Sequence, residues 1–262
     1  MKYIDCKKYA QEILDAVKAI PNKKKLVILT VGDDPASQSY VKGKIKDCEY
    51  CGIPYEHIKV DTPGALNWRI HFANNDPEVG GIIVQLPLPK GMDEKFYTDQ
   101  VLITKDVDGF KENSPFKPCT PEGIMYLLRK EVGDLTGKRA LVIGRGKLVG
   151  APVAKMLLDA DCTVTVAHSK TKSMEWELGN ADIVVSAAGR PNTVDLGCCW
   201  NAEAVIDVGV NRDKNGKLCG DCYDFTYCYP PGTKVTPVPG GIGLMTRAML
   251  MAHVAGLNVE EL

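Results

Sequence analysis

The sequence predicts an α/β protein of two lobes, each with a parallel sheet flanked by helices. Short β-branched runs alternate with amphipathic stretches along nearly the whole chain of 262 residues, which is the pattern of strand-helix-strand units. Prolines and an asparagine interrupt this periodicity over 111–120 and divide the chain into two parts. We therefore predict one domain over 1–117, completed by a C-terminal helix over 243–262, and a second over 118–242, with a cleft between the lobes.

Six segments give the clearest strand signals, because each is rich in apolar residues and is followed by a glycine, proline or polar turn. They are 25–31, 81–86, 139–143, 163–167, 183–187 and 204–208. Helices are expected over 121–130, which has proline in its first turn, and over 241–256, where apolar residues are spaced to face a core. In open α/β sheets ligands bind beyond the carboxyl ends of strands, so residues at those ends are the first functional candidates.

Composition and charge exclude several classes of protein. The net charge of −1 gives no polybasic field for nucleic acid or anionic lipid. The N-terminus lacks the apolar core of a signal peptide, and no later stretch approaches the ~20 uninterrupted apolar residues of a membrane span. We expect a cytoplasmic protein that binds neither nucleic acid nor membranes.

The ten cysteines are scattered and include an adjacent pair, which favours reduced thiols over a disulfide framework. Two pairs have C-x-x-C spacing, Cys48 with Cys51 and Cys219 with Cys222, but the pairs are far apart in the sequence and no histidine accompanies them. We expect no metal. The first pair is expected to line part of a helix, and the second to flank a Gly-Asp turn.

A glycine-rich turn follows the predicted strand over 139–143. It runs Gly144-Arg145-Gly146-Lys147-Leu148-Val149-Gly150 and leads into a helical segment. Gly144 and Gly146 allow the backbone to approach a pyrophosphate closely, Gly150 allows the helix to pack on the strand, and the helix N-terminus offers N–H groups and a positive dipole. The spacing is one residue longer than the common G-x-G-x-x-G pattern. Its position after an apolar strand predicts a Rossmann-like dinucleotide site, with a merely structural turn as the alternative.

The next strand, over 163–167, bears on the choice of dinucleotide. No acidic residue at its end offers hydrogen bonds to the free 2′-hydroxyl of NAD. The chain continues instead with His168-Ser169-Lys170-Thr171-Lys172, and Arg145 projects from the glycine turn. Hydrogen-bond donors and positive charge suit a 2′-phosphate, so NADP is favoured over NAD. NAD remains the alternative if these residues are solvent-exposed loop cations that do not contact the cofactor.

Candidate chemistry also stands in the first half of the chain. Tyr40 and Lys44 are four residues apart, which on a helix places phenol and ammonium on one face. The alternative, favoured by this segment alone, is a surface helix with a lysine-rich face. A Tyr-x-x-x-Lys pair also serves short-chain dehydrogenases, but there it follows the glycine-rich motif instead of preceding it.

Two further candidates follow strands or lie in turns. Gln85 ends an apolar strand before two prolines that stiffen the turn, where it can contact a ligand or orient Lys44. The segment Lys105-Asp106-Val107-Asp108-Gly109-Phe110 puts two acids around a valine. Such a turn is usually an Asx cap, but one carboxylate can accept paired hydrogen bonds from an amidine-like ring edge.

Together these residues resemble the bifunctional methylenetetrahydrofolate dehydrogenase/methenyltetrahydrofolate cyclohydrolase family over essentially the full length. The matching blocks are Ser37-x-x-Tyr40-Val41-x-x-Lys44-x-Lys46, Gly81-Ile82-Ile83-Val84-Gln85-Leu86-Pro87-Leu88-Pro89, Lys105-Asp106-Val107-Asp108-Gly109-Phe110, Pro118-Cys119-Thr120-Pro121, Gly144-Arg145-x-x-x-Val149-Gly150-x-Pro152, His168-Ser169-Lys170-Thr171 and Thr236-Pro237-Val238-Pro239-Gly240-Gly241-x-Gly243-x-Met245-Thr246.

The resemblance implies that Lys44 is the central catalytic residue, assisted by Tyr40 and by Gln85, which hydrogen-bonds it. It implies substrate contacts from Tyr40, from Asp108 to the pterin, and from the loop of Pro237, Gly240 and Gly241. It further implies cofactor contacts from Gly144, Arg145, Gly146, Val149, Gly150, His168, Ser169 and Thr246. A homodimer through the cofactor lobe is also implied.

The activity that the resemblance implies is oxidation of 5,10-methylenetetrahydrofolate to the methenyl compound with NADP, followed by hydrolysis to 10-formyltetrahydrofolate. A dehydrogenase without significant hydrolysis and a non-catalytic dinucleotide-sensing module are the alternatives. The sequence departs from the family pattern at Gly146, where serine is usual, at Leu244, where proline is usual, and in a shortened loop after Phe110. Cys222 stands where the family often has valine, which favours the non-metal interpretation of its C-x-x-C pair.

Overall fold

The computed structural model describes residues 2–223 and 232–262. The chain divides into two compact units. The three-stranded unit comprises Gln11–Cys119 and Arg247–Leu262, and the six-stranded unit comprises Met1–Ala10 and Thr120–Thr246. The helices α1 (Cys6–Ala19) and α8 (Ile242–Ala255) each contribute several residues to both units.

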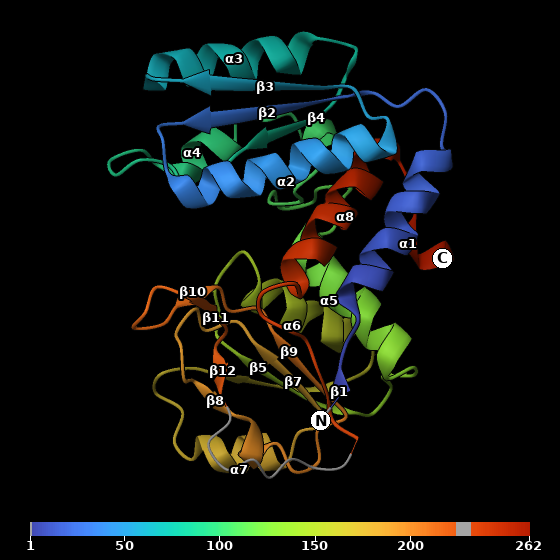
Figure 1. The fold of residues 1–262 in the computed structure, drawn as a ribbon, viewed down its shortest axis with the longest axis vertical. Coiled ribbons are helices and arrows are strands. Elements are labelled where there is room, and N and C mark those ends of the chain that lie inside the picture. The colour runs from blue at the N-terminus through green and yellow to red at the C-terminus, as the bar shows by residue number, and fades with distance from the viewer. Residues whose placement is uncertain (1, 224–231) are drawn as a thin grey trace. The chain divides into compact units, whose positions relative to one another are not determined.

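The three-stranded unit has a parallel sheet of β2 (Lys25–Val31), β3 (Tyr55–Val60) and β4 (Val79–Val84) in the order β3-β2-β4. Figure 1 shows α2 (Pro35–Cys51) and α3 (Pro63–Asn75) on opposite sides of these strands. Apolar side chains of alternate strand residues pack against Leu66 and Ile70 of α3. The short helices α4 (Glu94–Thr98), η1 (Ile103–Lys105) and η3 (Val259–Glu261) complete this unit.

Helix α2 begins and ends where local chemistry dictates. The Asp34 carboxylate accepts a hydrogen bond of 2.7 Å from the Ser37 N–H, and a proline occupies the first turn. The helix ends at Gly52, whose φ of 65° lies in the left-handed region that glycine adopts without strain. These caps fix the two ends of the helix that carries Tyr40 and Lys44.

The six-stranded unit is a parallel sheet in the order β1-β13-β9-β7-β5-β6. Its strands are β1 (Lys2–Tyr3), β5 (Arg139–Ile143), β6 (Thr163–Ala167), β7 (Ile183–Ser186), β9 (Ala204–Asp207) and β13 (Lys234–Val235). The helices are α5 (Cys119–Glu131), α6 (Gly150–Asp159), α7 (Met174–Gly179) and η2 (Leu196–Cys198). Two small ladders pair β10 (Asn211–Arg212) with β11 (Leu218–Cys219) and β12 (Cys222–Tyr223) with β8 (Val194–Asp195).

The strand order of this sheet reverses at β5. The chain passes from β5 to β6 on one side and then returns to β7 on the other side of β5. A reversal of this kind opens a crevice at the carboxyl ends of the central strands, where ligands of doubly wound sheets bind. The glycine turn at Gly144 follows β5 directly, so it lies at this reversal.

The predicted α/β class with parallel sheets flanked by helices is confirmed. Strands over 25–31, 139–143 and 163–167 have the predicted bounds, whereas the strand predicted over 81–86 runs over 79–84. Strand β3 has no signal in the sequence, because it is an edge strand whose side chains are mostly exposed and therefore lack an apolar run.

The sequence predicts residues 1–10 as part of the first domain, but the structure groups them with the six-stranded unit. The reason is pairing of β1 with β13, in which the N–H groups of Lys2 and Ile4 donate to the carbonyls of Thr233 and Val235 at 2.9 Å. A two-residue strand carries no periodicity that a sequence can reveal.

The nine cysteines in the described ranges are free thiols, and Cys228 lies outside those ranges. Cys48 and Cys51 are buried on α2, as predicted, while Cys219 and Cys222 belong to β11 and β12 on either side of Gly220 and Asp221. Within residues 2–223 and 232–262, no three His, Cys, Asp or Glu side chains gather as metal ligands would. No helix in the same ranges is both long and apolar enough to cross a bilayer.

Candidate functional site

Lys44 is a buried lysine in the three-stranded unit. Its side chain on α2 is only 4% exposed, and its Nζ donates a hydrogen bond of 3.1 Å to Oε1 of Gln85. Nζ also lies 5.5 Å from the centre of the Tyr40 ring. The alternative of an exposed lysine-rich face is therefore wrong for Lys44, and the predicted contact with Gln85 is present.

Gln85 is itself held in one orientation. Its backbone N–H donates to the Leu29 carbonyl at 2.9 Å, which continues the β4 to β2 ladder by one residue. Its side-chain Nε2 donates to the Leu86 carbonyl at 2.7 Å, so Oε1 is the atom left to face Lys44. Gln85 takes one of the three hydrogen bonds that an ammonium offers, and no other residue within 2–223 and 232–262 takes a second, so the others can go to a ligand.

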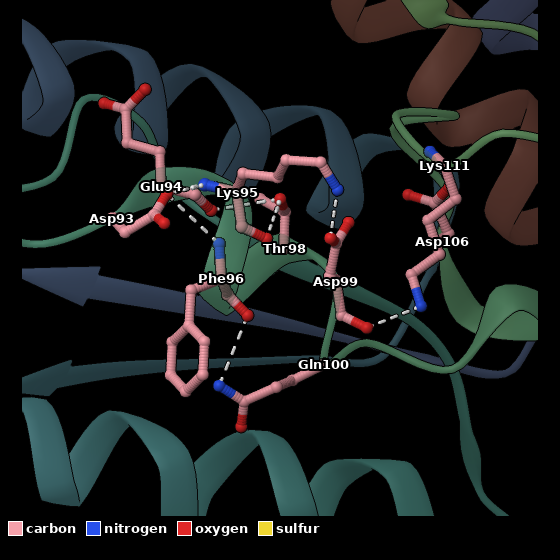
Figure 2. A network of polar contacts seen from close by, with 9 residues as sticks. All are labelled: Asp93, Glu94, Lys95, Phe96, Thr98, Asp99, Gln100, Asp106 and Lys111. Carbon is pink, nitrogen blue, oxygen red and sulfur yellow. Dashed lines mark hydrogen bonds and ion pairs between the residues drawn. The ribbon is translucent and has the colours of Figure 1, made fainter.

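The turn around Asp108 separates the roles of its two acids. The Asp106 carboxylate accepts hydrogen bonds from the N–H groups of Phe110 at 3.2 Å and Lys111 at 2.9 Å, so Asp106 is the cap of the turn. Lys111 also donates from Nζ to the Asp99 carbonyl at 2.7 Å, which ties the turn to the end of α4 (Figure 2). Among the described residues the Asp108 carboxylate has no hydrogen-bond donor, so it is the acid that can receive a ligand.

The backbone beneath Asp108 is fixed from two elements. His253 of α8 donates from Nδ1 to the Val107 carbonyl at 2.8 Å, and the Cys119 N–H donates to the Asp108 carbonyl at 3.2 Å. Gly109 has a φ of 71°, and a Cβ there would lie 2.4 Å from the Lys117 carbonyl oxygen, so only glycine fits. This contact joins the turn to the segment before α5.

The electrostatic surroundings connect Asp108 with Lys44. Burial raises the pKa of the half-buried Asp108 carboxyl, and the negative charge of Asp106 raises it further. The positive charge of Lys44 and the charge of His253 act in the opposite direction and lower this pKa. Lys44 and Asp108 both belong to the three-stranded unit, and the positive charge of Lys44 favours the ionised form of the Asp108 carboxyl. A carboxylate kept short of hydrogen bonds is a strong acceptor for paired N–H donors of a ligand.

A cavity of about 330 Å³ lies beside Gln85 in the same unit. Val41 and Ile45 of α2 form one wall, and the ends of β2 and β3 form another. The cavity gives small molecules access to the side of Gln85.

In the six-stranded unit the glycine turn is built as predicted, with one difference. Gly144 has a φ of 104° and a Cβ there would lie 2.3 Å from the Ala187 carbonyl oxygen, while a Cβ on Gly150 would lie 2.3 Å from the Gly144 carbonyl oxygen. Both positions therefore require glycine. Gly146 has no atom near its Cβ position, so its lack of a side chain leaves open space instead of resolving a clash.

The start of α6 offers fewer N–H groups than the sequence pattern suggested. The Ala151 N–H donates to the Gly146 carbonyl at 3.0 Å, and Pro152 has no N–H. A bound pyrophosphate must therefore be held mainly by the turn itself, including the segment around Val149 that caps the helix, with the helix dipole adding positive potential.

The segment after β6 forms a tight basic turn beside the glycine turn. The His168 N–H donates to Thr171 Oγ1 at 2.9 Å, and His168 Nδ1 accepts from the Lys170 N–H at 3.1 Å. Ile143 and Ala167 are register partners, and the Gly144 N–H donates to the Ala167 carbonyl at 2.9 Å. Arg145 and Ser169, which are both exposed, thus follow neighbouring strand ends, as a 2′-phosphate site requires.

The loop after β13 contains the remaining candidates. A Cβ on Gly241 would lie 2.2 Å from the Pro237 carbonyl oxygen, and Gly240 has a φ of 93°, so both glycines are required by a compact turn. Thr246 lies farther along, on α8, where its hydroxyl donates to the Ile242 carbonyl at 3.1 Å and lies 2.9 Å from Thr120 Oγ1. Its hydroxyl is thus already engaged within the unit, which makes it the weakest of the cofactor candidates.

Sequence reasoning missed the buried acid that shapes the loop after β7. Asp221 is fully buried and accepts hydrogen bonds from the N–H groups of Ala188, Gly189 and Arg190 at 2.8–3.1 Å and from the Ser186 hydroxyl at 3.0 Å. That loop carries the Ala187 carbonyl against which Gly144 packs. An acid after glycine in a polar segment gives no signal of its own, since the loop N–H groups that it binds lie more than thirty residues away.

Comparison with known proteins agrees with this arrangement. Residues 4–108 match the model of the tetrahydrofolate dehydrogenase/cyclohydrolase catalytic domain, and residues 118–261 match that of the corresponding NAD(P)-binding domain. A bifunctional protein FolD from Dechloromonas aromatica is 43% identical over an alignment of 270 positions, which covers 95% of this chain and 94% of that protein.

Solved structures of high similarity are also known. The bifunctional FolD enzyme of Campylobacter jejuni has a TM-score of 0.88 at 37% identity and covers 96% of both chains. The Trypanosoma brucei dehydrogenase-cyclohydrolase, solved with NADP and an inhibitor, has a TM-score of 0.88 at 32% identity and covers 96% of this chain and 95% of that one. From both domain matches and these relatives, the chain belongs to the tetrahydrofolate dehydrogenase/cyclohydrolase family.

Proposed function

We propose that the protein oxidises 5,10-methylenetetrahydrofolate to 5,10-methenyltetrahydrofolate with NADP and hydrolyses the product to 10-formyltetrahydrofolate. The observation that carries the proposal is the buried ammonium of Lys44, bonded to Gln85 and electrostatically coupled to Asp108. A non-catalytic module that only senses a dinucleotide would not require the buried Lys44 ammonium and the Asp108 carboxylate in its three-stranded unit.

Folate is held by the three-stranded unit. The Asp108 carboxylate, which is left without donors by the described residues, accepts two N–H groups from the amidine-like edge of the pterin. The ring of Tyr40 lies beside Lys44 and supplies an aromatic face for the folate. The family resemblance assigns further substrate contacts to Pro237, Gly240 and Gly241, which form a compact turn in the six-stranded unit. These contacts orient the methylene carbon without forming any covalent bond to the protein.

NADP, when bound, supplies the acceptor for the hydride that leaves the methylene carbon. The residues that would hold it are Gly144, Arg145, Gly146, Val149 and Gly150 of the turn, with His168 and Ser169 after the next strand. They fit the 2′-phosphate, because Arg145 and Ser169 are exposed at neighbouring strand ends and no acid follows β6. The two folate nitrogens stabilise the cation that forms, so the protein contributes mainly orientation and charge.

Hydrolysis requires proton transfer by Lys44, which the hydride transfer does not. Water adds to the methenyl carbon and a carbon–nitrogen bond then breaks, which requires a proton to be moved to the leaving nitrogen. Lys44 Nζ is the proton-carrying group of the site, and the fixed Oε1 of Gln85 holds it in place. The Tyr40 ring beside Nζ limits how far the ammonium can move.

The proposal extends to organisation. The six-stranded unit, which comprises Met1–Ala10 and Thr120–Thr246, is the dinucleotide-binding domain, and the three-stranded unit is the folate domain. The protein is a cytoplasmic homodimer that associates through its cofactor domain. Sedimentation equilibrium checks the dimer, and a monomer at micromolar concentration would contradict it.

The test compares two variants of neighbouring lysines on α2. Lys44→Met should reduce hydrolysis of methenyltetrahydrofolate by about 10²- to 10⁴-fold, the usual contribution of a general acid–base group. Lys46→Met removes an exposed charge two residues away and should leave the rate unchanged. Both rates are followed spectrophotometrically without NADP, and dehydrogenation is then assayed separately with NADP and with NAD. Unchanged hydrolysis in Lys44→Met, or no folate-dependent reduction of NADP by the wild type, would refute the function.

A further inference from the structure

The face of α2 that carries Lys44 holds a second, unexplained charged group. Tyr40, Gly43, Lys44 and Asp47 have the spacing i, i+3, i+4 and i+7, so they form one stripe along the helix. Tyr40 and Lys44 are the catalytic candidates of this stripe. Its other two members, Gly43 between them and the buried acid Asp47 after them, have no role in the proposed reaction.

Arg247 of α8 fills the space above Gly43. A Cβ built on Gly43 would lie 1.7 Å from Nη1 of Arg247, 2.8 Å from Cζ and 3.2 Å from Cδ. The guanidinium therefore rests directly on the helix backbone, one residue before Lys44, and only glycine leaves room for it. Arg247 thus places a positive charge on the same stripe as Tyr40 and Lys44.

Asp47 holds the guanidinium by charge alone. Nε of Arg247 lies 3.0 Å from Oδ2 of Asp47, whose residue is 7% exposed, yet neither atom has a partner at hydrogen-bond geometry within the described residues. Burial raises the pKa of the Asp47 carboxyl, and the charge of Arg247 opposes this rise. No hydrogen bond from the terminal Nη groups of Arg247 to any described residue is present. The two terminal nitrogens of this partly buried guanidinium are therefore free to donate hydrogen bonds to an acceptor on a ligand.

We propose that Arg247 binds a carboxylate of the glutamate moiety of the folate substrate, and so determines specificity for the anionic end of that molecule. The inference rests on the proposed function, which supplies a substrate with a ring system at one end and carboxylates at the other. Asp108 suits the ring edge, and a planar guanidinium is the best match for a carboxylate because it can donate two parallel hydrogen bonds. Arg247 and Lys44 are the two cations of the stripe, and the reaction already uses Lys44.

The test uses a substrate that lacks the carboxylates. Wild type, Arg247→Met and Arg247→Lys are assayed for dehydrogenation with 5,10-methylenetetrahydrofolate and with 5,10-methylenetetrahydropteroate, which ends at the benzoate and has no glutamate. Arg247→Met should raise KM for the folate by roughly 10- to 100-fold, the loss expected for a charge-assisted hydrogen bond, with kcat little changed. It should leave KM for the pteroate at the wild-type value, and Arg247→Lys should recover part of the folate affinity.

A second variant perturbs the same contact without removing the charge. Gly43→Ala puts a methyl group where the guanidinium rests and should displace it, raising KM for the folate but not for the pteroate. An equal rise in KM for both substrates in Arg247→Met and Gly43→Ala would mean that the residues only support the helix, and would overturn the inference. So would an unchanged KM for the folate in Arg247→Met.

Failure of the proposed function is recognised separately. If the wild type turns over neither substrate, binding of tetrahydrofolate and tetrahydropteroate is measured by calorimetry. A selective loss of tetrahydrofolate affinity in Arg247→Met still supports the carboxylate contact, and equal affinity of the wild type for both compounds overturns it. Loss of hydrolysis in Lys44→Met with unaltered kinetics in Arg247→Met would uphold the reaction and refute the inference alone.

Discussion

Replacing Asp108 with asparagine should make the protein more stable and less able to bind folate. The carboxyl is half-buried, accepts no hydrogen bond from the described residues, and lies near the capping carboxylate of Asp106. A charge in such surroundings costs stability, and removing an unfavourable functional charge commonly stabilises a protein by about 0.5–2 kcal/mol. The partial exposure of Asp108 places the expected gain at the lower end, about 1 kcal/mol at neutral pH.

The pH dependence has a definite sign. Burial raises the pKa of Asp108 in the folded protein above the ordinary value of about 3.9 for aspartate. The folded state then binds the proton more tightly than the unfolded state, so this group favours folding below its ordinary pKa and loses that contribution as pH rises through the raised pKa. The stability difference between Asp108→Asn and wild type should therefore grow from acid to neutral pH.

Urea unfolding followed by far-ultraviolet circular dichroism between pH 4 and pH 8 measures the difference in unfolding free energy. The same preparations are assayed for KM of methylenetetrahydrofolate, which should rise by roughly 10-fold or more as a charge-assisted contact is lost. Asp106→Asn is the contrasting variant, because that carboxylate caps two N–H groups and its loss should destabilise the protein. If Asp108→Asn is less stable than wild type at neutral pH, or binds folate equally well, the reasoning about this turn is wrong.

Three further outcomes are expected. Gly144→Ala gives a residue with a side chain a φ of 104° and places its Cβ within 2.3 Å of the Ala187 carbonyl oxygen. This strain should lower the free energy of unfolding by roughly 1–3 kcal/mol. Fluorescence titration should show that NADP binding is abolished while folate binding persists. Arg145→Met should raise KM for NADP by roughly 10-fold and leave KM for NAD unchanged, and equal changes for both would remove Arg145 from the 2′-phosphate site. Burial raises the pKa of the Cys48 thiol to about 12 and of the Cys51 thiol to about 11, so neither should react with iodoacetamide in native protein at pH 8, and labelling found by mass spectrometry before unfolding would contradict their burial.

Several parts of the site were predictable because their signals are local. The turn that begins at Gly144 stands between an apolar strand and a helix, and its glycines are required by contacts that arise within a few residues of the turn or on the adjacent strand. Tyr40 and Lys44 share a helical face because of their spacing alone. Gln85 and Asp108 were singled out by their positions at a strand end and in an acidic turn, and the family resemblance supplied their roles.

Other features depend on contacts between residues far apart in the chain. Lys44 is buried and meets Gln85 across 41 positions, Asp106 and not Asp108 caps the turn, and Arg247 rests on Gly43 from the other end of the sequence. Burial and pairing result from packing of separate elements, which a short stretch of residues does not encode by itself. The sequence by itself therefore determined the fold class, the glycine turn and the set of candidate side chains. Only the tertiary structure decided which of those side chains are buried, which are already hydrogen-bonded, and which remain available to a ligand.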